Sequence, residues 1–351
     1  MGGWWFIHTK PKITNPKPAP STSVTSAAAS TIASDFYLDD LITGGDDIQE
    51  VIKLVLEVDR ILRSANFTLR KWNSNSPEIQ GMVSAKLNTH ELSQHSITRL
   101  GDDSYKILGL EWSSHTDTLM FSTKSQLKLH IVTKRNILSR VSSIFDPLGL
   151  IGPVLVVAKC LIQKLWLDKA EWDQGVPSDL LKQWEVFYEG LKKLHTIQIP
   201  RHVIITEFKV IELHGFSDSS VVAYGAAIYV RSINSKGKIQ SRLLMAKSRV
   251  APIKKKTIPR LELCAAHLLA EIMNKVKIAL KHHIVNNLKY WSDSSVVLAW
   301  IRTEPYKLNS FVANRVTKIQ TLTNTADWNW VPSIENPADI LSRGTTAERL
   351  I

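Results

Sequence analysis

The sequence predicts an α/β fold in its last third, a mixed sheet with helices on both faces, and an α+β half before it. After residue 206, strand patterns and helical spacing alternate as three strands, helix, strand, helices, strand, helix, which is typical of one mixed sheet. Residues 133–195 keep a mostly helical pattern. The chain has 351 residues, 44% hydrophobic and 22% charged, which is ordinary for a globular protein of roughly two domains.

The first part of the chain is predicted to be a disordered tail, residues 1–34, followed by an α+β segment, residues 35–120. Residues 8–34 are rich in Pro, Ser, Thr and Ala and lack acidic residues, so they cannot bury enough apolar surface to fold. Two short strands should flank Asp39-Asp40. A helix should then begin near Asp47, because Asp47 and Glu50 form a capping box before an apolar stripe.

Residues 121–205 are predicted to be a helical segment, and residues 206–351 the sheet domain. Helical spacing runs from Ile137 to Phe145, where the residues Asp-Pro-Leu-Gly at 146–149 break it. In the sheet domain, strands are predicted at 211–217, 222–230, 242–248, 288–292 and 328–331, and helices at 259–276, 294–301, 308–322 and 338–343.

Four acidic residues lie at the ends of these predicted elements: Asp218, Glu262, Asp293 and Asp339. Strand ends and helix starts can meet at one edge of a sheet, and carboxylates that converge there repel one another unless cations neutralise them. Hard divalent cations such as Mg²⁺ prefer sites made only of oxygen atoms. Any one of these residues could be a surface or capping carboxylate, but the four together predict a metal-dependent nuclease.

The net charge of +12 suggests a polyanionic partner, although a basic chain can also be merely soluble. Residues 231–260 contain ten basic residues and no acidic one. Such a run is often a solvated face, but its position directly before Glu262 favours contacts with phosphates. The predicted nucleic-acid-binding residues are Lys247, Arg249, Lys254, Lys255, Lys256 and Arg260.

Other classes of protein are disfavoured. Two cysteines, Cys160 and Cys264, indicate neither a disulfide framework nor a zinc site. The longest apolar run, 148–158, is too short to span a bilayer, so no membrane partner is expected, and we expect an intracellular location, cytoplasmic or nuclear. The chain lacks the Asp-Thr-Gly and Asp-Ser-Gly tripeptides of aspartic proteases, which argues against a peptidase.

The local contexts of the four acidic residues resemble the ribonuclease H domain of BEL/Pao-type retrotransposon polyproteins. The resemblance extends upstream, because Tyr37-Leu38-Asp39-Asp40 is similar to the Tyr-x-Asp-Asp motif of reverse transcriptases. Residues 134–166, centred on Phe145-Asp146-Pro147-Leu148-Gly149, are similar to the segment between polymerase and nuclease in Pao elements. The resemblance as a whole therefore implies a ribonuclease H-like sheet preceded by a partial reverse-transcriptase palm and a helical thumb or connection segment.

The resemblance implies that Asp218, Glu262, Asp293 and Asp339 are catalytic ligands for two Mg²⁺ ions, with Mn²⁺ as an alternative, and that the substrate is an RNA:DNA hybrid. It also implies that Asp39 and Asp40 are metal ligands of a remnant polymerase site. A polymerase needs a further Asp from an earlier palm strand, and only the tail precedes residue 35. We therefore expect no independent DNA synthesis, with other parts of a retroelement polyprotein as further partners.

The sequence also leaves alternatives to a fully active nuclease open. Many ribonucleases H carry a His before the last Asp that is thought to help turnover, and residues 331–338 contain none, so slow turnover is expected. The chain could instead be an inactive retrotransposon remnant that binds nucleic acid through its basic surface. It could also be a fragment that does not fold alone, because half a palm leaves strands unpaired.

Overall fold

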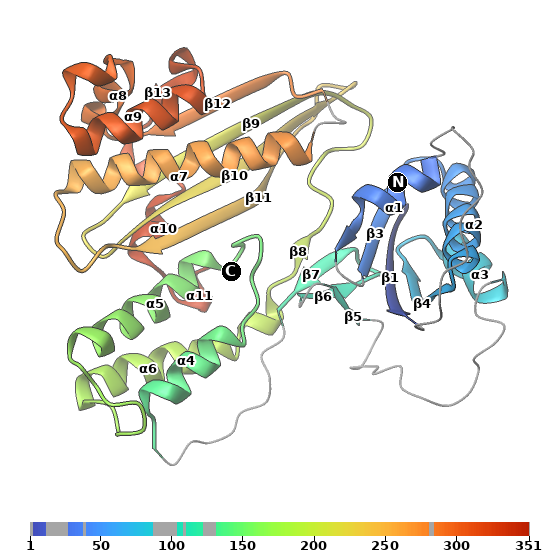
Figure 1. The fold of residues 1–351 in the computed structure, drawn as a ribbon, viewed down its shortest axis with the longest axis horizontal. Helices are drawn as coiled ribbons and strands as arrows, with labels where there is room; N and C mark the ends of the chain where they lie inside the picture. Colours follow the sequence, from blue (N-terminus) through green and yellow to red (C-terminus); the bar gives the residue numbers. More distant parts are fainter. Residues whose placement is uncertain are drawn as a thin grey trace. The chain divides into compact units, whose positions relative to one another are not determined.

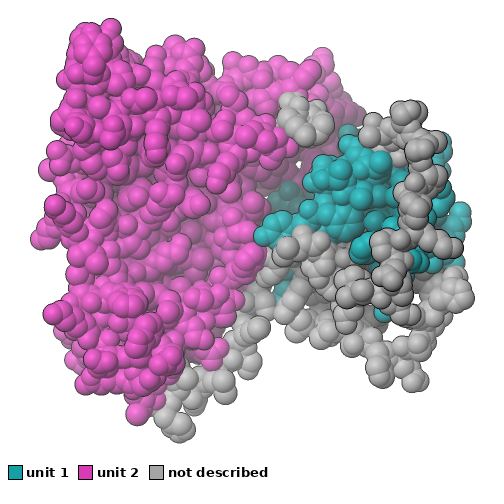
Figure 2. Space-filling view, viewed as in Figure 1, with its two compact units in different colours: residues 1–120, 198–201 teal, residues 121–197, 202–351 magenta. Residues whose placement is uncertain are grey.

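The computed structural model describes residues 3–11, 27–37, 40–86, 104–107, 110–121, 131–280 and 284–350. The chain divides into two compact units, coloured separately in Figure 2. Unit 1 contains residues 1–120 and 198–201, and unit 2 contains residues 121–197 and 202–351. No helix in the described ranges is long and apolar enough to cross a membrane.

Unit 1 contains a four-stranded antiparallel sheet in the order β2-β3-β1-β4 (Figure 1). Helix α2 begins where the capping box predicts, because the Asp47 side chain accepts a hydrogen bond of 2.8 Å from the Glu50 amide. Its buried stripe includes Val51, Val55 and Val58. The elements are β1 (Gly3–Pro11), α1 (Ala27–Ser34), β2 (Phe36–Tyr37), β3 (Asp40–Gly45), α2 (Ile48–Ser64), β4 (Phe67–Ser74) and α3 (Pro77–Lys86).

Two segments of the predicted disordered tail are regular elements in the structure. β1 lies between β3 and β4 and pairs with both, and residues 27–34 form α1. The pairing supplies backbone hydrogen-bond partners on both sides of β1, which composition alone does not reveal. Residues 12–26 of the predicted tail and Asp39 lie outside the described residues.

A second sheet of unit 1 joins four short strands: β5 (Ser104–Ile107), β6 (Leu110–Ser113), β7 (Thr118–Met120) and β8 (Ile199–Pro200). Asp117 links the turn before β7 to Arg201, which directly follows β8. Its carboxylate accepts two hydrogen bonds from the Arg201 guanidinium, at 2.6 and 2.8 Å, and one from Trp112 Nε1 at 2.9 Å. The bidentate geometry makes this a directional ion pair.

Unit 2 contains a five-stranded mixed sheet in the order β11-β10-β9-β12-β13. The first three strands are antiparallel neighbours, β12 is parallel to β9, and β13 is parallel to β12. The strands are β9 (Phe208–Ser219), β10 (Ala223–Asn234), β11 (Ile239–Val250), β12 (Asn287–Ser292) and β13 (Trp328–Trp330). The predicted mixed sheet is confirmed.

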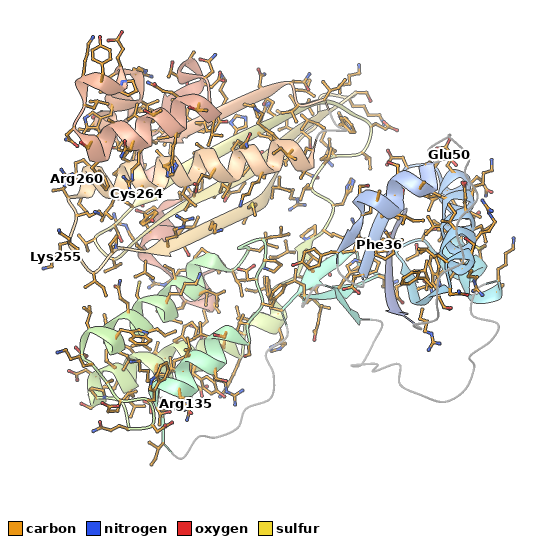
Figure 3. The ribbon with its side chains drawn as sticks, viewed as in Figure 1. Phe36, Glu50, Arg135, Lys255, Arg260 and Cys264 are labelled. Atoms are coloured by element: carbon orange, nitrogen blue, oxygen red, sulfur yellow. The ribbon has the colours of Figure 1, made fainter. Side chains whose placement is uncertain are left out.

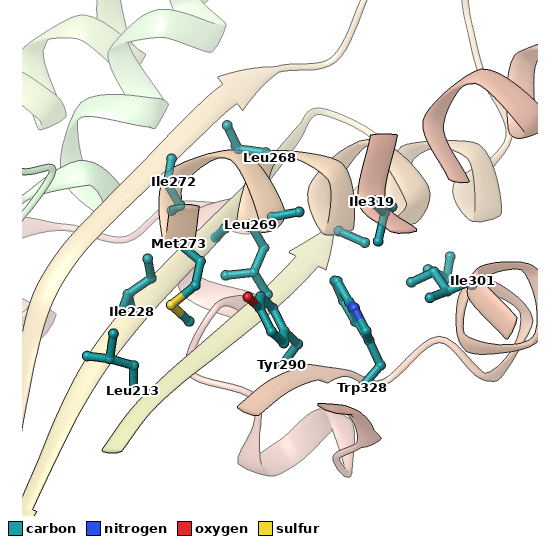
Figure 4. Close-up of a cluster of buried hydrophobic side chains, with 14 of the residues drawn as sticks. Leu213, Ile228, Leu268, Leu269, Ile272, Met273, Tyr290, Ile301, Ile319 and Trp328 are labelled. Carbon is teal, nitrogen blue, oxygen red and sulfur yellow. The ribbon is translucent and has the colours of Figure 1, made fainter. Parts of the chain in front are cut away.

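Helices cover both faces of this sheet, as predicted. The helices of the sheet domain are α7 (Ile258–Ala279), α8 (Ser295–Arg302), α9 (Ser310–Leu322), α10 (Asp339–Arg343) and α11 (Ala347–Leu350). The first three enclose the large apolar core with the sheet, in which Leu269 and Met273 pack near the stacked rings of Tyr290 and Trp328, 4.9 Å apart (Figure 4). On the other face, Leu341 of α10 packs in a small cluster with alanines of the sheet.

The predicted helical segment forms α4 (Lys134–Ser142), α5 (Gly152–Leu167) and α6 (Ser178–Leu191), and it packs within unit 2. The Asp146 carboxylate accepts hydrogen bonds from the Leu150 and Ile151 amides at the start of α5. The loop before α5 binds edge strand β11, because the Ala246 amide donates to Leu148 O at 2.8 Å. Gly149 has φ +71°, and a Cβ there would lie 1.9 Å from Ala246 O.

Candidate active site

Three of the predicted acidic residues meet at one edge of the mixed sheet. Asp218 is the penultimate residue of β9, Asp293 directly follows β12, and Glu262 lies near the start of α7. β9 and β12 are parallel and Ser292 lies opposite Ser217, so the residue after each reaches the same edge. One carboxylate oxygen from each of the three lies within 4.8 Å of the others.

Asp339, the fourth predicted residue, is the first residue of α10 and stands outside that group of three. Its charge contributes to the raised pKa of Asp218, which places it in the same electrostatic environment. Its carboxylate also accepts a 2.6 Å hydrogen bond from Arg343 Nε one turn later on α10. The Arg343 side chain is exposed, so this ion pair is a weak constraint.

Serine hydroxyl groups hold one oxygen of each clustered carboxylate. Ser342 Oγ donates to Asp218 Oδ2, Ser333 Oγ donates to Asp293 Oδ2 at 2.7 Å, and Ser219 Oγ donates to Glu262 Oε1 at 2.8 Å. The Ser219 amide donates to the same glutamate oxygen at 3.2 Å. The other oxygen, Glu262 Oε2, is buried and has no hydrogen-bond partner among the described residues.

This arrangement is electrostatically costly without a cation. Burial raises the pKa of Glu262 to about 8, and the nearby charge of Asp218 adds to the effect. Burial also raises the pKa of Asp218 to about 6; the charges of Asp293 and Asp339 add to this, whereas the bond from Ser342 opposes it. An all-oxygen group with an unpartnered buried oxygen fits a hard divalent cation.

The loop before α10 is tied to the sheet. Asn336 is buried, and its side-chain amide donates to Ser217 O at 3.1 Å while its oxygen accepts from the Ala338 amide at 3.1 Å. Gly225 on β10 permits the close approach of α10, because a Cβ there would lie 2.6 Å from Leu341 Cβ. The start of α10 is therefore positioned by β9 and β10.

The predicted basic residues fall into two groups. Lys247, Arg249, Lys254 and Lys255 are exposed, and Arg249 lies 3.8 Å from Glu271. Lys256 and Arg260 are half-buried and lie beside the ring of Phe311 on α9. Figure 3 shows Lys255 and Arg260 at the N-terminal end of α7.

The predicted remnant polymerase residues belong to unit 1. Asp40 is the first residue of β3, where it lies opposite His8 of β1. Asp39 lies outside the described residues. β1, the strand paired with β3, contains no Asp or Glu in its sequence Gly3–Pro11.

Sequence reasoning missed the residues that support the carboxylates: Ser219, Ser333, Ser342 and Arg343. Two of them carried a usable signal, because Ser342 and Arg343 stand three and four positions after Asp339 on one helix. Ser333 had none, since its bond to Asp293 joins two separate loops.

Comparisons with known proteins bear on this geometry. Residues 133–294 match the family model of the Pao retrotransposon-like RNaseH-like domain. Over these residues the resemblance to Pao retrotransposons that was inferred from the sequence is confirmed. The match covers just under half of the chain and includes α4–α6 as well as Asp218, Glu262 and Asp293. Asp339 lies beyond it.

Solved structures with similarity to the chain include ribonuclease H domains. The N-terminal RNase H domain of Rv2228c from Mycobacterium tuberculosis has 14% identity and a TM-score of 0.27, covering 38% of this chain and 91% of that one. LC11-RNase H1 in complex with an RNA/DNA hybrid has 14% identity and a TM-score of 0.27, covering 40% and 99%. A foamy viral protease-reverse transcriptase in complex with dsDNA has 14% identity and a TM-score of 0.22, covering 86% and 55%. No curated protein matches the chain.

Proposed function

We propose that this chain is an endoribonuclease that hydrolyses the RNA strand of RNA:DNA hybrids. The observation that carries the proposal is the convergence of carboxylate oxygens of Asp218, Glu262 and Asp293 within 4.8 Å, with one buried glutamate oxygen that has no hydrogen-bond partner in the described part of the chain. Asp339 completes the proposed ligand set from α10. These residues would hold two Mg²⁺ ions, with Mn²⁺ as an alternative, and a bound pair of such ions supplies water activation and stabilisation of the leaving oxygen.

The residues of the chain itself have defined tasks in this proposal. Ser219, Ser333 and Ser342 each fix one oxygen of a carboxylate and so orient its second oxygen. Such preorientation lowers the reorganisation needed when charge develops on the phosphate. Many ribonucleases H have a His before the last Asp, whereas residues 331–338 of this chain contain none, so slow turnover remains our expectation.

We also propose that unit 1 is a remnant of a polymerase palm without synthetic activity. Asp39 and Asp40 would be its remaining ligands. The proposal is supported by the absence of any acidic residue in β1, the strand paired with β3. Appreciable primer extension by the purified chain would overturn it.

A labelled RNA:DNA hybrid incubated with Mg²⁺ tests the nuclease proposal. We expect cleavage by the parent chain, and loss of cleavage in Asp218→Asn and Glu262→Gln. The matched control is Glu185→Gln on the exposed side of α6, which removes one carboxylate outside the site. If both site variants cleave as well as the parent, the assignment is wrong.

A second function is favoured by the cations beside Phe311. The chain could bind nucleic acid without cleaving it, as an inactive retrotransposon remnant. Hybrid binding that weakens steeply with salt, with no cleavage in Mg²⁺ or Mn²⁺, would support that function.

A further inference from the structure

Asp339 differs from the other three acidic residues at the sheet edge, because it alone forms an ion pair within the part of the chain that the structure describes. Its partner is Arg343, whose Nε lies 2.6 Å from Asp339 Oδ1 four positions later on α10. An acid that precedes a base at this spacing is the favourable order on a helix. The other three carboxylates receive hydrogen bonds from neutral serine hydroxyl groups. The counter-charge of the site is therefore concentrated at Asp339.

Arg343 also acts on acidic residues beyond its partner. The pKa of its guanidinium is raised, chiefly by the hydrogen bond to Asp339 and by the charge of that carboxylate, and the charges of Asp218 and Asp293 add to the effect. Burial raises the pKa of Asp218 to about 6, and the charge of Arg343 opposes that rise. The guanidinium thus supplies positive charge to carboxylates that otherwise repel one another.

The ion pair can open without a change in the fold. The side chain of Asp339 is 35% exposed and that of Arg343 is 68% exposed, so water can replace either partner. The backbone of Asp339 is held in place, because its amide donates to Asn336 O at 3.1 Å and its oxygen lies 3.0 Å from Ser342 Oγ. Ser342 Oγ also contacts the Asp218 carboxylate. Rotation of two side chains is therefore enough to free the Asp339 carboxylate.

A divalent cation and Arg343 compete for Asp339. Oxygens of Asp218, Glu262 and Asp293 already lie within 4.8 Å of one another, whereas Asp339 stands outside this group. One of its oxygens is engaged by the guanidinium. A divalent cation at Asp339 would also lie beside the positive charge of Arg343, and like charges repel in proportion to their product. The carboxylate can therefore serve one cation well only by releasing the other.

We infer that Arg343 is an internal counter-ion, which pairs with Asp339 in the metal-free chain and releases that carboxylate when a divalent cation binds. The inference rests on the proposed function in taking Asp339 as a metal ligand. Arg343 is then a positioning residue that acts through Asp339 and lowers the affinity of the site for the cation bound there. The chain consequently needs a higher Mg²⁺ concentration to fill the site than its carboxylates alone would require.

The test is a calorimetric titration of the full chain with Mg²⁺ in the absence of nucleic acid. Arg343→Gln removes the competing charge, and it should bind Mg²⁺ roughly fivefold more tightly than the parent does. Arg343→Lys keeps the charge and should bind with an affinity close to that of the parent. The matched control is Arg349→Gln on α11, which removes the same charge from an exposed side chain and should also follow the parent.

The direction of the change separates competition from support of the fold. If the guanidinium merely held α10 in place, Arg343→Gln would weaken Mg²⁺ binding or leave it unchanged, and either result would overturn the inference. In an Asp339→Asn background, the substitution of Arg343 should lose most of its gain, because the two residues are coupled. A gain of full size in that background would show that Arg343 acts without Asp339, which also contradicts the inference.

The same titration distinguishes this inference from the proposed function. A parent chain that binds no divalent cation would overturn both. A parent chain that binds Mg²⁺ but cleaves no hybrid would contradict the nuclease proposal alone, and the affinity of Arg343→Gln would still decide the role of Arg343.

Discussion

Replacement of Glu262 by Gln should stabilise the metal-free chain at neutral pH. The unfolded residue, with the ordinary pKa of 4.5, has released its proton by pH 7, whereas the folded residue with a pKa of about 8 retains it. One pKa unit corresponds to ~1.4 kcal/mol, and at pH 7 only the interval from pH 4.5 to pH 7, about 2.5 units, contributes. The raised pKa therefore destabilises the fold by about 3 kcal/mol at pH 7. The amide of Gln cannot titrate, and its nitrogen can donate to the neighbouring aspartates.

The cost of the raised Glu262 pKa depends on pH, and this dependence can be measured. A raised carboxyl pKa costs nothing well below pH 4.5, costs progressively more as pH rises, and reaches its full cost above about pH 8. Unfolding in urea with a chelator present, at several pH values from 5 to 8, should show the free energy of unfolding falling more steeply in the parent than in Glu262→Gln. The control Glu185→Gln should follow the parent. Parallel curves for the parent and Glu262→Gln would refute the reasoning.

Other predictions concern the metal, the loop before α5 and the extent of the nuclease unit. Mg²⁺ should raise the melting temperature of the parent but not of Asp293→Asn, since a ligand stabilises only the fold that binds it. Gly149→Ala should destabilise the chain by more than about 2 kcal/mol, because the new Cβ would clash with β11 and the left-handed backbone disfavours Ala. Gly190→Ala is its control in open helical surroundings and should be neutral or stabilising, as thermal unfolding will show. A fragment starting at residue 131 should cleave hybrid better than one starting at 201, which lacks α4–α6.

The elements of the sheet domain could be predicted because each is encoded locally. Alternation of apolar residues gives the strands, and a stripe at helical spacing from Leu261 to Val276 gives α7. The meeting of Asp218 and Asp293 also followed, because residues that end parallel strands reach the same edge. This rule alone, without any other tertiary contact, predicts that the two carboxylates lie close together.

Contacts between distant segments could not be predicted in the same way. The bond from Ser342 to Asp218 joins residues 124 positions apart. The spacing of Ser342 from Asp339 on α10 suggests that the serine belongs to the site, but it does not identify Asp218 as its partner. The insertion of β1 between β3 and β4 depends on backbone pairing, which amino-acid composition does not predict. For the same reason Lys256 and Arg260 were recognised as basic, but their convergence with Arg315 on one ring was not.

The position of Asp339 depends on the helical segment as well as on the sheet. Gly344 ends α10 with φ +82°, and a Cβ there would lie 2.6 Å from a methyl of Val157 on α5. The next residue, Thr345, donates its amide to Pro153 O of α5 at 3.0 Å. α10 is only one turn long, so its own hydrogen bonds cannot hold it in place. Contacts of α10 with α5 on one side and with β10 on the other must therefore fix Asp339. The helix α5 is thus part of the same folding unit as the acidic site.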